Sequence, residues 1–219
     1  MATGAQAIEA IARATGLLPA TVGRAARSLR EAGQDLWPQA APGGGKNAVH
    51  VRPGHLVNLV IALAVADPLT TAAVLTVIFR SLIKTQVNDG GYNENYLKCT
   101  FGQCMEKWVY ALNSDKSITP SNLALFADPT HGIKLILRKD ISGCNYPSAT
   151  LDIPIMGTPH RETNWFVSKN GSVDDLLSSP DAPLRWSCEV PFSLLVILTD
   201  LWADTLRSEA WAETLADTA

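Results

Sequence analysis

Residues that bind metals or cross-link secreted proteins are scarce in this chain of 219 residues. It has four cysteines and four histidines, and neither a Cys-x-x-Cys nor a His-Glu-x-x-His spacing occurs. Cys99 and Cys104 are the closest pair of cysteines, but no histidine lies near them in the sequence. A structural zinc site is therefore not expected. Buried thiols in a reducing compartment are the simpler interpretation.

An uninterrupted apolar run of membrane-spanning length is also missing. The longest apolar stretch, residues 55–79, is divided by Asp67 and Pro68, whereas a spanning helix needs about 20 apolar residues. We interpret the stretch as two buried helices, with Asp67 as the N-cap of the second helix and Pro68 in its first turn. Because no signal-peptide pattern is found either, we expect a cytoplasmic, nucleoid-associated protein without membrane contact.

The motifs of common catalytic sites are absent too. Gly-x-Ser-x-Gly, the P-loop and Gly-x-Gly-x-x-Gly do not occur in the sequence. These motifs position a nucleophile or a phosphate group, so each marks a definite chemistry when it is present. The sequence therefore predicts no enzyme activity, no cofactor and no metal ion.

The composition is that of a folded protein whose charge is unevenly distributed. Hydrophobic residues make up 47% and charged residues 18%, which excludes disorder of the whole chain. Residues 1–52 contain six basic and three acidic residues, whereas the rest of the chain contains twelve basic and eighteen acidic ones. Phosphate repels an acidic chain unless positive charge is concentrated locally. Nucleic acid is therefore expected to contact the N-terminal part.

The N-terminal part contains two segments with helical spacing of apolar residues. The first helix is predicted over residues 5–15, and Gly16 ends it. The second is predicted from Pro19 to about residue 32, because proline is tolerated in the first turn of a helix. Its inward face is predicted to comprise Val22, Ala25 or Ala26, and Leu29. This leaves Arg24 and Arg27 on the outer side.

Residues 36–51 read as two short extended runs around the glycines 43–45 and Lys46. Such a pattern predicts a hairpin with a flexible, basic tip. Arg52, Pro53 and Gly54 end this segment.

The order of helix, glycine turn, helix and basic hairpin resembles the winged helix-turn-helix of bacterial and phage transcription regulators. A small residue, Ala12, lies where the second helix packs closely on the first, and Gly16 follows four positions later at the turn. The apolar Leu17 comes next, and the β-branched Val22 takes the position that anchors the second helix. Two helices that cross steeply need such a small contact residue and a residue with positive φ at the turn.

The resemblance implies that the second helix is a recognition helix that enters the major groove of DNA. Arg24 and Arg27 would then bind guanine through paired hydrogen bonds or grip phosphate, and Lys46 on the wing would contact phosphate. Leu18, Pro19 and Ala20 offer no hydrogen-bonding side chain, so the two arginines, Thr21 and the wing would carry specificity. The residues predicted to bind DNA are Pro19, Ala20, Thr21, Arg24, Arg27, Lys46, Asn47 and Arg52.

The C-terminal half is predicted to be a mixture of one sheet and two helices. Thr100 is a plausible N-cap for a helix over residues 100–112. Short alternating runs separated by turn residues indicate a small antiparallel sheet, and an apolar stripe indicates a closing helix over residues 191–216. The four expected strands are residues 132–138, 149–156, 164–168 and 184–190.

The sequence thus predicts an α+β protein in three parts. These are a winged helix-turn-helix domain at residues 1–54, an apolar helical pair at 55–87, and an α+β domain for assembly or partner binding at 96–219. The expected function is a sequence-specific regulator of transcription that binds double-stranded DNA as a homodimer. The alternatives are a protein-interaction adaptor or inhibitor of a nucleic-acid-processing machine, and a repressor that senses a ligand through its C-terminal part.

Overall fold

The computed structural model describes helices in the N-terminal half of the chain and an antiparallel sheet in the C-terminal half, which confirms the α+β class. Within the described part, no helix is both long and apolar enough to cross a bilayer. The residues described are 2–39, 50–85, 99–114, 134–140, 147–154, 161–167, 185–191, 194, 197–199 and 201.

The first two helices, α1 (Gly4–Thr15) and α2 (Pro19–Glu31), follow the sequence prediction closely. Thr3 caps α1, because its hydroxyl accepts a hydrogen bond from the Gln6 N–H while the Gln6 side chain accepts one from the Thr3 N–H. The helix ends at Gly16, whose φ of 70° is left-handed. The predicted inward face of α2 is confirmed, since its buried residues are Val22, Ala25, Ala26 and Leu29.

After α2 the chain reverses through three successive residues in the left-handed region. Gly33, Gln34 and Asp35 have φ values of 72°, 48° and 52°. The turn is closed by the N–H of Leu36, which donates to the carbonyl of Gly33 at 3.2 Å.

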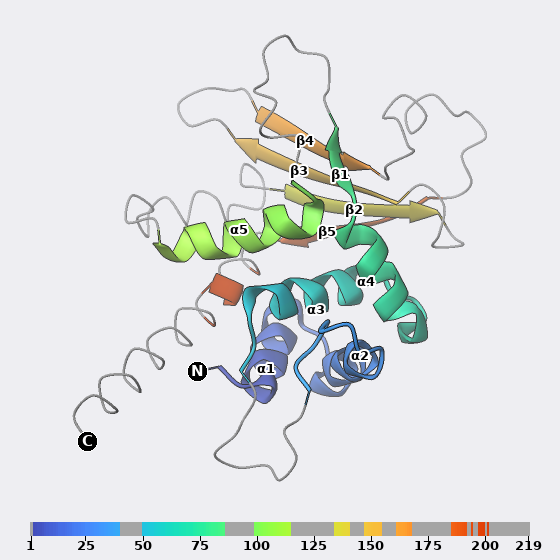
Figure 1. The fold of residues 1–219 in the computed structure, drawn as a ribbon, viewed down its shortest axis with the longest axis vertical. Helices are drawn as coiled ribbons and strands as arrows, with labels where there is room; N and C mark the ends of the chain where they lie inside the picture. Colours follow the sequence, from blue (N-terminus) through green and yellow to red (C-terminus); the bar gives the residue numbers. More distant parts are fainter. Residues whose placement is uncertain are drawn as a thin grey trace.

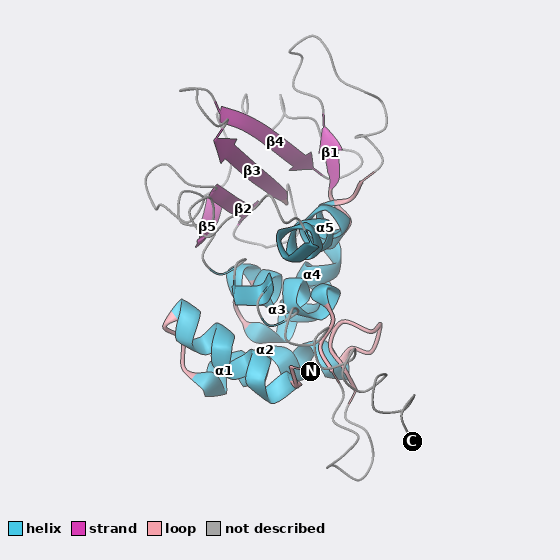
Figure 2. Ribbon diagram, turned by 90° about the vertical axis from the view of Figure 1, so that its left-hand side faces the viewer, coloured by secondary structure: helices cyan, strands magenta, loops and turns pink. Residues whose placement is uncertain are grey.

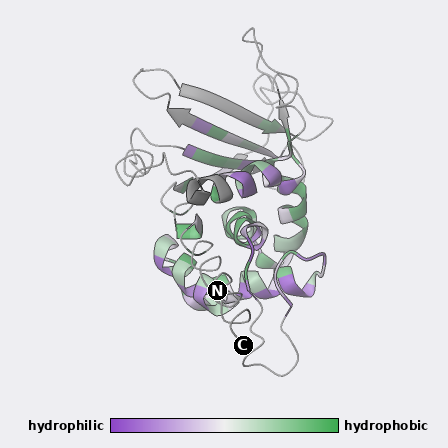
Figure 3. Cartoon of the chain, turned by 60° about the vertical axis from the view of Figure 1, so that its left-hand side comes forward, coloured by the Kyte–Doolittle hydropathy of each residue, from purple (hydrophilic) through white to green (hydrophobic). Residues whose placement is uncertain are grey.

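The third helix, α3 (Pro53–Val65), is the centre of the helical part. Ten of its thirteen residues are buried, and Figure 3 shows it in green at the middle of the molecule. A helix that is apolar on all sides is covered on all sides. It contacts α2 and four later elements: α4 (Ala72–Arg80), α5 (Phe101–Ser114), β2 (Lys134–Asp140) and β5 (Arg185–Pro191).

The helix predicted to begin at Pro68 begins four residues later. Pro68 precedes a 3-10 turn, η1 (Leu69–Thr71), and α4 (Ala72–Arg80) follows. The N–H and the hydroxyl of Thr71 both donate to the Pro68 carbonyl, at 3.0 and 2.8 Å. Asp67 is therefore not the N-cap of α4, because this tight turn separates it from the helix.

The fifth helix, α5 (Phe101–Ser114), begins at the cap that the sequence predicts. The N–H of Thr100 donates to the side-chain oxygen of Gln103 at 3.0 Å, and the N–H of Gln103 donates to the Thr100 hydroxyl at 3.3 Å. These reciprocal bonds form a capping box. The ring of Phe101 meets that of Phe166 edge to face, with centroids 5.3 Å apart.

The sheet has the strand order β1-β4-β3-β2-β5, and every neighbouring pair is antiparallel. Leu135 lies opposite both Leu151 and Val190, so one face carries a row of buried apolar residues. Figures 1 and 2 show α1 and α2 at one end of the molecule, the sheet at the other, and α3, α4 and α5 between them. The strands are β1 (Ile83–Thr85), β2 (Lys134–Asp140), β3 (Ser148–Pro154), β4 (Arg161–Val167) and β5 (Arg185–Pro191).

The four strands expected from the sequence are confirmed as β2 to β5, but β1 was missed. Residues 55–87 were expected to be a helical pair, whereas α4 ends at Arg80 and β1 joins the edge of the sheet. Three residues directly after a helix are too few to give an alternating pattern. Only its pairing with β4, which begins with Ile83 opposite Val167, reveals this strand.

The expected first arm of the hairpin, which starts at Leu36, is not a strand. Leu36 and Trp37 are buried, and the Leu36 carbonyl accepts a hydrogen bond from the side-chain amide of Asn58 at 2.8 Å. The segment therefore packs against α3 instead of pairing with a second arm.

The second arm pairs with the start of the chain. His50 forms an antiparallel bridge with Thr3, and the N–H of Val51 donates to the Ala2 carbonyl at 3.2 Å. Residues 40–49, which include the predicted basic tip, lie outside the described residues.

One cluster of buried hydrophobic residues extends from α1 to the sheet. It crosses the expected boundaries at residues 54 and 87 without a break in the packing. The division into three domains stays a prediction.

The two glycines at residues 16 and 23 should respond to alanine in opposite directions. A Cβ would meet nothing within 4 Å at either position, so only the backbone conformation matters. Gly16→Ala should lower the free energy of unfolding by about 1 kcal/mol, because φ is left-handed there. Gly23→Ala, inside α2, should raise it by about 0.5–1 kcal/mol. Urea denaturation of the full chain measures both, and changes of the same sign would contradict the assigned turn.

Candidate nucleic-acid interface

The predicted DNA-binding residues that belong to a helix lie on the outward face of α2. Pro19, Ala20, Arg24 and Arg27 are exposed, and Thr21 is half-buried. Arg24 and Arg27 are three residues apart and therefore project from neighbouring positions on one side. The guanidinium group of Arg24 donates to the Thr21 hydroxyl at 3.4 Å. These five predicted residues thus share one exposed surface.

Small residues behind this surface let α1 and α2 approach closely. Ala12 on α1 and Ala25 and Ala26 on α2 are all buried, and the two helices are in contact. The predicted role of Ala12 as a small residue in the core agrees with its 3% exposure. The turn between the helices leaves Leu17 and Leu18 exposed, and Leu18 is 72% exposed.

The arginines of this surface are not neutralised by acidic neighbours. In the described part, Arg80 forms an ion pair with Glu106, and Asp35 lies within hydrogen-bond distance of the imidazole of His55. Neither Arg24 nor Arg27 takes part in these contacts. Their charge is therefore available to an anionic partner.

The remaining predicted residues are not on this surface in the described part. Lys46 and Asn47 lie outside the described residues. Arg52 is exposed, but it precedes α3 and lines a cavity of about 670 Å³. Other charged or polar residues of this cavity were not singled out from the sequence: they are Gln34, Asp35, His55, Asn58, Arg80, Glu106 and Lys107.

His55 is the buried imidazole of this cavity. Its Nδ1 accepts a hydrogen bond from the Arg52 N–H at 3.0 Å, and its Nε2 lies 3.4 Å from Oδ1 of Asp35. Nε2 therefore carries the proton of the neutral ring. Burial lowers the pKa of His55, which nearby Arg52 and Arg80 also lower and Asp35 raises in part.

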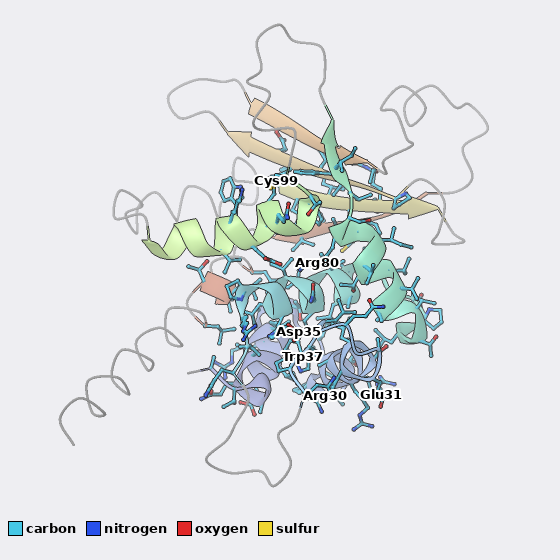
Figure 4. The ribbon with its side chains drawn as sticks, in the orientation of Figure 1. Arg30, Glu31, Asp35, Trp37, Arg80 and Cys99 are labelled. Atoms are coloured by element: carbon cyan, nitrogen blue, oxygen red, sulfur yellow. The ribbon has the colours of Figure 1, made fainter. Side chains whose placement is uncertain are left out.

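Arg80 joins three helices beside this imidazole. Its Nη1 donates to Oδ1 of Asn58 at 2.7 Å, and its Nη2 forms an ion pair with Glu106. Figure 4 shows Arg80 between α3 and α5, and Arg80 lines the cavity together with Asp35 and His55. No spacing in the sequence could show this cluster, because its members come from different elements.

The hydrogen bonds of the cavity hold segments of the chain together and occupy the polar groups that could otherwise act on a ligand. Both ring nitrogens of His55 are engaged, so the neutral imidazole has no lone pair left for a general base. Within the described residues, no group of three or more potential metal ligands occurs.

No family model matches this chain, and neither curated proteins nor solved structures give a significant match. The functional proposal therefore depends on the chain's own residues. The outward face of α2 carries two exposed arginines without an acidic partner among the residues described, whereas the exposed Arg52 and Lys107 share the lining of the cavity with Asp35 and Glu106.

Acid should destabilise the fold through His55. Its pKa in the folded state is lowered from 6.5, so below that value the unfolded chain binds more protons than the folded chain. Stability should therefore fall as pH falls through the interval between 6.5 and the lowered pKa. His55→Gln keeps an acceptor for the Arg52 N–H but does not titrate. Urea denaturation between about pH 7 and pH 5 should show a weaker pH dependence for this variant.

His50→Gln is the matched control, since it also removes one imidazole but leaves the contacts of His55 intact. The difference in slope between His55→Gln and His50→Gln then isolates the contribution of His55. Equal slopes for the parent and His55→Gln would contradict the role assigned to His55.

Proposed function

We propose that the chain is a sequence-specific regulator of transcription that binds double-stranded DNA through a winged helix-turn-helix, with α2 as the recognition helix. The observation that carries the proposal is the outward face of α2, where exposed arginines lack acidic partners in the described part. Its opposite face is buried against α1 and α3. Such a helix is held rigidly while its outer side remains available for the major groove.

The electrostatics of the chain support the same surface. The N-terminal part carries a formal charge of +3 in a protein of net charge −3. A local excess of positive charge of this kind directs a polyanion to one side of the molecule. Lys46 and Asn47, in the segment between Gln39 and His50, are proposed as the wing contacts.

The two arginines should carry base discrimination. A paired arginine–guanine contact is worth roughly 1–3 kcal/mol against the wrong base. We therefore expect Arg24→Ala or Arg27→Ala to abolish the preference for one base pair without changing the melting temperature. Binding to a selected site and to its single-base variants, measured by fluorescence anisotropy, tests this. Lys107→Ala removes an exposed charge from α5 and should leave the preference intact.

If both arginine variants discriminated among sequences as the parent does, the proposed recognition surface would be wrong. The dependence of DNA affinity on salt tests the proposal independently. Phosphate contacts make this affinity fall steeply between about 0.05 and 0.2 M salt.

The exposed leucines at the turn support a second candidate function. Leu18 is 72% exposed and Leu17 39%, and both adjoin the arginines of α2. An apolar tip of this kind is also suited to a protein partner, as in an adaptor or an inhibitor of a nucleic-acid-processing machine. Binding that resists salt but is lost in Leu18→Ser would favour this candidate, because apolar contacts are not screened.

We also propose that the chain forms a homodimer through α4. Val74 and Val77 lie three residues apart on this helix and are 60% and 40% exposed. Ile83, on the nearby edge strand β1, is 36% exposed. A second copy that covered this apolar surface would double the number of DNA contacts.

A charge on this surface should break the dimer. Val74→Lys should convert the protein from dimer to monomer, because pairing would bury an uncompensated ammonium group. Light scattering after size exclusion measures the mass. Ala5→Lys adds the same charge at an exposed position of α1 and should remain dimeric. A dimer of unchanged stability in Val74→Lys would place the interface elsewhere.

A further inference from the structure

Cys99 and Cys104 were expected to be buried thiols, but the structure brings their sulfur atoms together at the start of α5. The two sulfurs are 3.0 Å apart, and both residues are half-buried. This separation exceeds the bonded one of about 2.05 Å by only about 1 Å. Figure 4 labels Cys99 on the side of α5 that faces the sheet.

The capping box of α5 explains why a spacing of five residues gives this contact. Thr100 is the N-cap, so Cys99 is the residue before the cap and Cys104 is the fourth residue of the helix. Side chains at these two positions pack against each other in many helices with a capping box. Here both side chains are thiols, so the packing contact is also a potential covalent bond.

The backbone around both thiols is anchored by other contacts. Thr100 forms an antiparallel bridge with Ile83, and the N–H of Phe101 donates to the Leu82 carbonyl at 2.7 Å. Cys104 lies in the regular part of α5. We therefore expect the remaining gap to close through movement of the side chains, with these backbone contacts retained.

We propose that Cys99 and Cys104 are a modification site, at which they form a reversible intramolecular disulfide by exchange with a small-molecule disulfide such as glutathione disulfide. The thiolate of one cysteine attacks a sulfur of glutathione disulfide, and the first glutathione leaves as a thiolate. The second cysteine, as its thiolate, attacks the protein sulfur of the mixed disulfide and releases the second glutathione. Two protein thiols are oxidised, one glutathione disulfide is reduced to two glutathione thiols, and the two protons pass to these products.

A disulfide at this site would restrain the junction between the helices and the sheet. Phe101 packs on Phe166 of the sheet, and Gly102 lies where an added Cβ would come within 3.1 Å of the Arg80 side chain. A covalent bond from residue 99 to residue 104 encloses both positions. Oxidation therefore restrains the turn on which this junction depends.

A single tryptic peptide reports the bond. Trypsin cleaves after Lys98 and after Lys107, so both cysteines lie in the fragment of residues 99–107. The full native chain is equilibrated with mixtures of reduced and oxidised glutathione, treated with iodoacetamide and digested. We expect a fragment that is lighter by two hydrogen atoms and carries no alkyl group. Oxidation of the native chain should be roughly tenfold or more favourable than that of the chain unfolded in urea, because the fold holds the sulfurs together.

Two variants separate the pair from a general reactivity of thiols. Cys104→Ser should leave Cys99 as a stable mixed disulfide with glutathione, because the second step has no nucleophile. Cys188→Ser should not change oxidation of the pair. The oxidised parent should also melt on the order of a few degrees higher than the reduced parent.

The opposite results would overturn the proposal. These are glutathione attached separately to both cysteines, or alkylation of both thiols in the native chain under conditions that oxidise the unfolded chain. Oxidation that is no more favourable in the native chain than in urea would overturn it equally.

Discussion

The guanidinium group of Arg80 fixes the arrangement of three helices. Arg80 is the last residue of α4, and its guanidinium group donates to Asn58 of α3 and forms an ion pair with Glu106 of α5. A half-buried guanidinium group needs acceptors for its donors, and removal of one acceptor leaves charge uncompensated. Gly102 has no side chain at the place where the stem of Arg80 passes. The packing of α5 on α4, and with it the contact between α5 and the sheet, depends on this fit.

The face of α2 that we propose for DNA binding is supported by the same framework. Asn58 donates to the carbonyl of Leu36 and so holds the segment after α2 against α3. His55, one turn earlier on α3, contacts Asp35 in that segment. The outer side of α2 thus carries the charges, while the residues that determine its orientation lie one helix further inward. The cavity beside α3 is best understood as part of this support.

Local signals in the sequence were sufficient for the helix ends. Gly16 and the pair of Thr100 and Gln103 act on residues a few positions away, so their effects can be predicted without the fold. The strand at Ile83 could not be predicted, because its identity depends on pairing with residues far along the chain. The same applies to the partners of Arg80. For the candidate site, the exposed arginines of α2 followed from periodicity, whereas the position of Arg52 beside a cavity did not.

The left-handed turn after α2 has a consequence for the variation that the chain tolerates. Gly33, Gln34 and Asp35 all have positive φ, a conformation that suits glycine and is accepted by aspartate but costs most other residues about 1–2 kcal/mol. Within this turn, Gln34 is thus the residue that fits the left-handed backbone least well. Over evolution, substitution of Gln34 by glycine or asparagine would raise the stability of the fold. Substitution by a β-branched residue would lower the stability of the fold and be selected against, although the side chain is exposed to solvent.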